Sequence, residues 1–506
     1  MLQSTCAAGL CVGCDNKSQN EEREKMKKSF KLSEEAFQMD GKMPLSQAIP
    51  LGLQHVLAMF VGNLTPLLII TGACGLAGGE FAQLQLSLLQ NAMLVAGIVT
   101  LVQLFSIGPV GGKVPIIMGT SSGFIGVFNS VAASMGGGVL AYGAIMGASI
   151  IGGLFETVLG FFLKPLRKFF PAVVTGTVVM SIGLSLISVG INSFGGGNNA
   201  KDFGSVENLL LAVFVLAMIL VFKHGTKGFL SSSAILFGIL AGYVVAIIMT
   251  LTLPHTGIDA DGVQYTYSWV VDFAQVKNAA WIAVPSFIGF GALSDVKITF
   301  QASAIIPIGI MFIVTAIETV GDISACIEGG MDREATDSEL SGGVICDGLG
   351  SAFAALFGVL PNTSFSQNVG LVSLTKVVNR FAISMGAIFL ILCGFCPKIG
   401  ALMSIMPQSV LGGAAVMMFA SILISGIQLI TKHPIGSREI TIISVAIGLG
   451  YGLGATTGAT AHLPYYVQLI FGGSGIVPCS LAAIILNIVL PKESKPVREM
   501  WELEDK

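Results

Sequence analysis

The chain has 506 residues, of which 53% are hydrophobic and 11% charged, and its mean hydropathy is +0.83. Soluble domains have about 25% charged residues, so this composition excludes an ordinary soluble protein and predicts an all-α polytopic membrane protein with the lipid bilayer as its environment. The net charge of −3 points to no particular partner, and we expect no nucleic-acid partner.

Residues 1–48 predict an N-terminal tail, because the first long apolar run starts near Ile49. The tail holds a close tract of Cys6, Cys11 and Cys14 beside a Lys/Glu-rich run, which favours a disordered segment. Weak metal binding or lipidation of the tract stays an alternative. No cleavable signal peptide is recognised, and we expect neither a metal site nor a cofactor.

Apolar windows of about 20 residues predict fourteen membrane spans, two of them short. They lie near 49–72, 86–107, 115–130, 139–163, 170–191, 208–223, 229–253, 303–327, 342–360, 366–376, 380–400, 408–430, 438–454 and 463–490. If both termini share one side, all but four of the 26 Lys and Arg fall on that side. The positive-inside rule then predicts cytoplasmic termini, and we expect a plasma (inner) membrane location.

The two halves of the chain repeat each other. Residues 170–176 are echoed by 406–412, and the short polar segment 115–124 holds the place in the first half that 361–370 holds in the second. Seven spans per half is an odd number, so the second half is predicted to be inverted, as in alternating-access carriers. A chance match of Pro and Gly, which are common in membrane helices, is the alternative.

Charged side chains inside a span are costly and therefore indicate function. Glu318 and Asp322 are spaced i and i+4 in span 8, which places them on one helical face, where two carboxyls could share a proton. The alternative for Asp322 is a solvated cap at the end of the span. His55 in span 1 and Asp347 in span 9 either organise a site or satisfy hydrogen bonds within the helix bundle.

Residues 360–376 are polar and broken by glycine, although long apolar runs flank them. Non-helical backbone at bilayer depth survives only where it is buried in protein or lines a cavity, and in transporters such segments mark the binding site. Gln367 and Asn368 each offer donors and acceptors, which suits the edge of a nucleobase. A satisfied loop amide is the alternative.

The run 367–376 resembles the signature of the nucleobase-ascorbate transporter (nucleobase:cation symporter-2) family: Gln or Glu, then Asn, then Gly370 and Thr375 at their spacing. The Gln54-His55 pair, the segment 318–322 and Asp347-Gly348 also look like family motifs in the expected order. The resemblance covers about 47–491. It implies a fourteen-span, seven-plus-seven inverted fold in which short strands from spans 3 and 10 cross beside the substrate.

The resemblance also implies that a core domain of spans 1–4 and 8–11 moves against a gate domain of spans 5–7 and 12–14. The corresponding parts are a cytoplasmic N-terminal tail (1–48), core (49–163 and 303–400), gate (164–253 and 401–490), an extracellular linker (254–302) and a cytoplasmic C-terminal tail (491–506). A homodimer through the gate domain is a further expectation from the family.

Carried over residue by residue, the family pattern makes Glu318 and Gln367 the direct substrate ligands. Residues expected to organise the site or to belong to its proton-linked network are Asn368, Asp347, Asp322, His55, Gly370 and Thr375. Family members often have an aromatic residue at the span 3 crossing, but this sequence has Ser122 there. Either the aromatic wall is missing or Phe124, two residues later, supplies it.

The expected function is proton-coupled symport of an oxidised purine. Gln at position 367 is similar to xanthine and uric acid carriers, whereas uracil carriers tend to have Glu there. Alternatives are uracil or ascorbate as substrate, Na⁺ in place of H⁺, and an anion exchanger or channel of related architecture. An integral-membrane enzyme is disfavoured because the five His are scattered and no zincin, Ser-His-Asp or two-metal spacing occurs.

Overall fold

The computed structural model describes residues 33–491, apart from 167–168, 198–199, 228, 259–261, 432–433, 457, 465–466, 469–470 and 472–474. The tract of Cys6, Cys11 and Cys14 lies outside the described residues, as does the C-terminal tail beyond Pro491.

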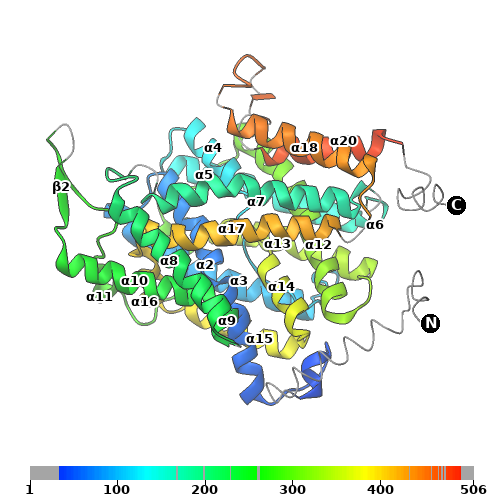
Figure 1. Cartoon of the computed structure of the whole chain (residues 1–506), viewed down its shortest axis with the longest axis horizontal. Helices are drawn as coiled ribbons and strands as arrows, with labels where there is room; N and C mark the ends of the chain where they lie inside the picture. The colour runs from blue at the N-terminus through cyan, green and yellow to red at the C-terminus, as the bar shows by residue number, and fades with distance from the viewer. Residues whose placement is uncertain are drawn as a thin grey trace, which may run out of the picture.

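The first half is a series of helices interrupted once by a strand (Figure 1). Its elements are η1 (Glu34–Phe37), α2 (Leu45–Ala73), η2 (Gly79–Phe81), α3 (Ala82–Phe105), β1 (Met118–Thr120), α4 (Ile125–Ser134), α5 (Gly138–Phe161), α6 (Leu163–Leu166), α7 (Ala172–Phe194), α8 (Val206–Gly225), α9 (Phe229–Ser232) and α10 (Ala234–Thr252). A linker with local structure follows: β2 (Thr256–Ile258), β3 (Gln264–Thr266), α11 (Ala274–Asn278) and η4 (Gly291–Leu293).

The second half repeats this order. Its elements are α12 (Ala302–Met331), α13 (Asp337–Leu356), β4 (Asn362–Ser364), α14 (Ser366–Thr375), α15 (Arg380–Gly394), α16 (Pro397–Ser404), α17 (Gln408–Thr431), α18 (Ser437–Ala455) and α20 (Ile476–Val489). In both halves two long helices precede a strand with a short helix, and further helices follow. The predicted repeat is therefore visible in the succession of elements.

Packing between the halves is reciprocal, as an inverted repeat requires. Helix α5 packs on α13, and their counterparts α15 and α3 pack on each other. Helices α7 and α17, which follow at equivalent positions, run side by side through the middle of the molecule (Figure 1). Strands β1 and β4 pair antiparallel, with Gly119 opposite Thr363.

The number of membrane crossings is not confirmed as fourteen. Among the described residues, eight helices are long and apolar enough to cross a membrane, or nine if α15 and α16, bent by 83° to each other, form one broken span. Helices α4 and α14 have 10 residues each and are too short to cross alone. Each of these short helices directly follows a strand, α4 after β1 and α14 after β4.

The strand pair is stable among apolar helices because side chains of neighbouring helices accept hydrogen bonds from its backbone N–H groups. Met118 N donates to Thr100 Oγ1 of α3 (3.0 Å), and Thr120 N donates to Asn63 Oδ1 of α2 (2.8 Å). Across the ladder, Asn362 N donates to Ser351 Oγ of α13 (3.0 Å). The position of the strands is thus fixed by polar residues on three different helices.

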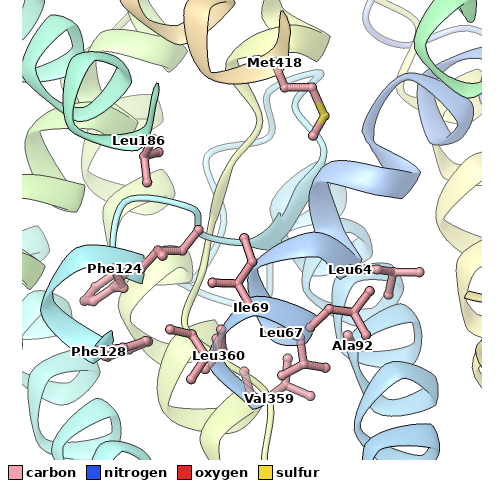
Figure 2. Packing of buried hydrophobic residues seen from close by; sticks show 14 of the residues in the cluster. Leu64, Leu67, Ile69, Ala92, Phe124, Phe128, Leu186, Val359, Leu360 and Met418 are labelled. Atoms are coloured by element: carbon pink, nitrogen blue, oxygen red, sulfur yellow. The ribbon is translucent and has the colours of Figure 1, made fainter. Parts of the chain in front are cut away.

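Apolar side chains fill the space around the strands. Figure 2 shows part of this cluster, with Leu64 and Leu67 of α2, Phe128 of α4 and Leu360 just before β4. All four side chains are fully or almost fully buried. The centre of the protein is therefore a packed core in which a small polar site is embedded.

Candidate functional site

A pocket opens where the two strands and the start of α14 meet helices α7 and α17. It is lined by Gly62, Thr120, Ser122, Gly123, Ile182, Glu318, Thr363, Ser364, Phe365, Ser366, Gln367, Met418, Phe419 and Ile422. Every polar member belongs to a segment predicted as core. The members from segments predicted as gate are all apolar: Ile182 of α7 and Met418, Phe419 and Ile422 of α17. The pocket thus has one polar wall and one apolar wall.

Glu318 brings a carboxylate to the polar wall from the middle of α12. Its side chain is only 5% exposed, and Oε2 accepts no hydrogen bond from any residue that the structure describes. An ionised carboxylate is expensive to bury without a partner. This oxygen is therefore suited to accept a hydrogen bond from a ligand or to hold a proton.

Asp322, one turn further along α12, is held by hydroxyl groups just before the signature. Ser364 Oγ donates to Oδ2 (2.6 Å), and Ser366 Oγ donates to Oδ1 (2.9 Å). The aspartate is 4% exposed, which excludes the solvated cap considered above. Asp322 does not line the pocket and instead ties α12 to the strand and helix that do.

Asp347 plays a similar structural part from α13. Its fully buried carboxylate accepts hydrogen bonds from Thr319 Oγ1 of α12 and Thr363 Oγ1 of β4 (3.2 Å for the latter). Its Oδ1 has no partner among the described residues. Asp347 therefore lies behind the pocket and is connected to it by the hydroxyl group of Thr363, which lines the pocket.

His55 and Asn368 join the first helix to the signature. Asn368 Nδ2 donates to the backbone oxygen of His55 (2.9 Å) and lies 3.1 Å from its Nδ1. Because Nδ2 can only donate, this geometry requires Nδ1 to be the acceptor. Both residues are buried and neither lines the pocket, so they anchor α14 on α2.

Among the signature side chains that the structure describes, only Gln367 reaches the pocket, and it is half-buried there. Gly370 is exposed, and Thr375 Oγ1 donates to Leu371 O within the same helix (2.8 Å). Lys376, which follows in the left-handed region at φ 57°, donates from Nζ to Gly329 O at the end of α12 (2.6 Å). The later signature residues shape and end α14 without lining the pocket.

The structure places Ser122 in the pocket lining but not Phe124. Phe124 is fully buried beside Phe128, with ring centroids 5.2 Å apart (Figure 2). Its ring centroid also lies 4.8 Å from that of Phe312. The aromatic rings that line the pocket are those of Phe365 and Phe419. Phe365 had a sequence signal, an aromatic residue within the polar segment, whereas Phe419 stands in an unremarkable apolar run.

Glu156 was missed by the sequence reasoning. It stands in the apolar run of α5, is fully buried, and its Oε1 lies 3.3 Å from Thr315 Oγ1 of α12. A lone carboxyl within a predicted span was the signal that could have identified it.

Comparison with known sequences places the chain among transporters. The model of the Permease family (Xan_ur_permease) matches residues 46–458. The chain is 35% identical to the uric acid permease PucK of Bacillus subtilis, over 87% of this chain and 95% of PucK. It is 30% identical to the xanthine permease XanP of Escherichia coli, over 92% of this chain and 96% of XanP.

Two solved structures share the fold. The transmembrane domain of the cyanobacterial bicarbonate transporter BicA matches with a TM-score of 0.50 at 15% identity, covering 88% of this chain and 97% of that domain. SLC26A9 matches with a TM-score of 0.57 at 10% identity, covering 96% of this chain and 72% of that protein. These likenesses support the inverted-repeat architecture and concern the fold alone.

The family match and the two curated relatives confirm the resemblance seen in the signature, and these relatives are permeases, not enzymes. Long apolar helices and this family together identify an integral, multi-pass membrane protein. The chain belongs to the Permease family, and its similarity to PucK and XanP extends over 95% and 96% of those two proteins.

Proposed function

We propose that the protein is a proton-coupled symporter that imports an oxidised purine, xanthine or uric acid, by an elevator-like movement of its core against its gate. The observation that carries this proposal is the division of the pocket into a polar core wall and an apolar gate wall. All lining groups that can hold a polar substrate then move together with the core. The substrate need not break hydrogen bonds to the gate during this movement, because the gate wall is apolar.

The substrate class follows from the pocket and the relatives. Glu318 offers an open acceptor to ring N–H groups, and Gln367 offers both a donor and an acceptor to the alternating edge of an oxopurine. Phe365 and Phe419 can cover the ring faces. The uric acid and xanthine permeases named above support these two purines as the first candidates.

Proton coupling is supported by the charge balance of the two helices behind the site. Helices α12 and α13 carry Glu318, Asp322 and Asp347 in buried positions, yet their sequences contain no Lys, Arg or His. Without a basic partner on these helices, protons can neutralise the carboxyls. Binding of substrate and proton together lowers the cost of moving the site through the membrane. The alternative that Na⁺ is the coupling ion in place of H⁺ is tested by the uptake assay described below.

Domain movement is supported by how glycines pack. Within the core, a Cβ added to Gly153 would lie 2.5 Å from Gly348 O, and within the gate, a Cβ added to Gly426 would lie 2.6 Å from Gly176 O. Gly321, which faces the gate from α12, would meet only Leu429 Cδ1 at 3.5 Å and Thr175 Cβ at 3.8 Å. Tight packing inside each body and ordinary packing between them suit two bodies that slide.

Among the alternatives, an anion exchanger has the support of the shared fold alone. The described lining of the pocket contains a carboxylate and no Lys or Arg, which disfavours a small anion. Uracil is disfavoured by Gln367 for the reason given with the signature. The inner-membrane location, the cytoplasmic termini and a homodimer through the gate are parts of the same proposal.

The test is uptake of labelled xanthine and uric acid by transport-deficient cells that express the protein. Unlabelled uracil, guanine and hypoxanthine serve as competitors, and a protonophore and removal of Na⁺ identify the coupling ion. Xanthine or uric acid uptake that the protonophore abolishes supports the proposal. Uptake of neither purine, or flux that ignores the proton gradient, contradicts it.

A further inference from the structure

We propose that Glu156 is a further proton-binding carboxyl of the carrier, which acts on the substrate site through the hydroxyl groups of α12. The inference rests on the proposed proton coupling and names a residue outside the family signature. Glu156 does not line the pocket, so it is a positioning residue whose protonation changes how α12 presents Glu318.

The position of Glu156 leaves its carboxyl poorly satisfied. The side chain is fully buried in α5, Oε2 has no partner among the described residues, and Oε1 has only the Thr315 hydroxyl at 3.3 Å. A buried carboxylate with one hydrogen bond is strongly destabilising, whereas a protonated carboxyl is an ordinary polar group.

Close helix packing surrounds the group. Glu156 lies one turn from Gly152 and Gly153, where α5 packs on both α12 and α13. A Cβ on Gly153 would lie 2.9 Å from Ala352 N, and one on Gly348 would lie 2.7 Å from Thr157 Oγ1. The helices therefore approach backbone to backbone, and the side chains of the three helices must satisfy the carboxyl.

The charged groups that face Glu156 are all acidic. Glu318 on α12 and Asp347 on α13 are near enough for their charges to act on it, and α4 contributes no titratable residue. The sequences of α5, α12 and α13 contain no Lys, Arg or His, and Lys164 of α6 is exposed beside Asp337. Since these helices offer no basic side chain, protons must neutralise this group of carboxyls.

Thr315 connects Glu156 to the helix that carries Glu318 of the substrate site. Its hydroxyl carries one hydrogen, and Phe312 O (3.2 Å) competes for it with Glu156 Oε1. When Glu156 is protonated, its O–H can donate to Thr315 Oγ1 while Thr315 donates to Phe312 O. When Glu156 is ionised, Thr315 must turn its hydrogen to the carboxylate and leave the carbonyl.

The next turn of α12 carries Thr319, which donates to Asp347. Thr315 and Thr319 are i and i+4, and Glu318 stands between them in the sequence with its free oxygen at the pocket. Loss of the proton from Glu156 therefore changes the hydrogen bonding of the turn that presents Glu318. The proton leaves a carboxyl oxygen of Glu156 and is accepted by a carboxylate oxygen of Glu318 or Asp347, each of which has one without a partner among the described residues, and only O–H bonds are formed or broken.

The decisive variant is Glu156→Gln, which imitates the protonated carboxyl. We expect the wild-type KM for purine uptake in proteoliposomes to rise between about pH 6 and about pH 8, and the KM of Glu156→Gln to stay near the wild-type pH 6 value throughout. Purine counterflow without a proton gradient should continue at the wild-type rate within about twofold. Glu156→Asp should restore the pH dependence.

Ser149→Ala is the matched control, because Ser149 is buried in the same helix and donates only to Ile145 O of its own turn. Thr315→Val removes the proposed link by replacing the hydroxyl with a methyl group in a side chain of the same shape, and it should flatten the same pH profile even if Glu156→Gln fails to fold. Infrared difference spectra of the purified protein between acid and alkaline pH should show a protonated-carboxyl band that is weaker in Glu156→Gln.

Two outcomes separate the inference from the proposed function. If wild-type uptake depends on the proton gradient and folded Glu156→Gln and Thr315→Val keep the wild-type pH profile, the role of Glu156 is disproved and the symporter stands. If wild-type uptake is indifferent to pH and to the gradient, the symporter proposal fails, and the role of Glu156 fails with it.

Discussion

Glu318 lines the pocket, and its carboxylate oxygen Oε2 has no hydrogen-bond partner among the described residues. Glu318→Gln replaces an acceptor by an amide that can also donate, so a ring N–H loses its charged acceptor. Hydrogen bonds to charged groups contribute about 1.5–3 kcal/mol, which corresponds to a roughly 10- to 100-fold weaker Kd. Calorimetric titration with xanthine or uric acid checks this, with exposed Glu207→Gln as the control. An unchanged Kd would remove Glu318 from the list of ligands.

Position 367 decides between purines and uracil in this proposal. Gln367→Glu removes the amide donor that can reach a keto oxygen and replaces it by an acceptor. Loss of one such hydrogen bond weakens purine binding roughly tenfold. Competition assays should show weaker xanthine binding together with stronger inhibition by uracil. Equal losses for both nucleobases would mean that Gln367 supports binding without selecting the substrate.

The strand β1 has little room for a side chain at its centre. A Cβ added to Gly119 would lie 2.7 Å from Asn63 Oδ1, Met59 Cε and Phe365 Cε2. Gly119→Ala should therefore displace Asn63, which holds Thr120 N, and Phe365, which lines the pocket, at a cost of about 1–3 kcal/mol. Thermal unfolding in detergent and purine binding should both be impaired. Gly309→Ala on α12 is the control, because its Cβ meets nothing within 4 Å.

The start of α13 predicts a pH-dependent contribution to stability. Burial opposes ionisation of Glu339, but hydrogen bonds from Arg333 (2.5 and 2.9 Å) and Thr336 outweigh it and lower the pKa of Glu339 below 4.5. A lowered pKa stabilises the folded protein above the unfolded-state value, and this stabilisation is lost as the pH falls through the folded pKa. Glu339→Gln should cost roughly 0.5–1 kcal/mol at neutral pH.

The difference in Tm between wild type and Glu339→Gln should close as the pH falls below about 4.5, the ordinary value for this group. Glu334→Gln, at an exposed position near the same helix start, is the control. A difference that persists in acid would assign the effect of Glu339 to packing and not to its charge.

At the scale of the whole molecule, the elevator-like proposal predicts that two glycines respond differently. Gly321→Leu places a side chain in the buried contact between α12 and the gate, where the Cβ itself has ordinary distances, so Tm should fall less than in Gly426→Leu while turnover falls tenfold or more. Gly426→Leu forces α17 away from α7 and should lower Tm strongly. Counterflow rates and thermal unfolding measure the two effects. A Gly321→Leu protein with full turnover would contradict the sliding movement.

Much of the architecture could be predicted from the sequence because the two halves of the chain repeat the same order of elements. The family resemblance implied strands in spans 3 and 10, where β1 and β4 lie, and the short span expected at 366–376 matches α14 nearly to its ends. The spans expected near 115–130, 366–376 and 380–400 are not confirmed as crossings, since α4 and α14 have 10 residues each and α15 has 15, fewer than the roughly 20 that cross a bilayer alone.

The site was only partly readable, since the sequence does not show which face of a helix turns inward. Phe124 and Phe365 each stand close to a strand, but only Phe365 lines the pocket. Glu156 belongs to the polar network only because α5 packs on α12 and α13, a contact between distant parts of the chain. Glu318 was predicted because its cost within a span is evident from the residue alone.

The strand pair also has a consequence for biosynthesis. The ribosome completes β1 and all the helices of the first half before it has made β4, so the nascent chain enters the membrane with the unpaired backbone of one strand. That backbone can be satisfied only by side chains such as Thr100 and Asn63 until translation delivers its partner. A transcript truncated after α10 would therefore yield inserted helices but no transport site, and two halves made as separate polypeptides would have to insert in opposite orientations before they could restore it.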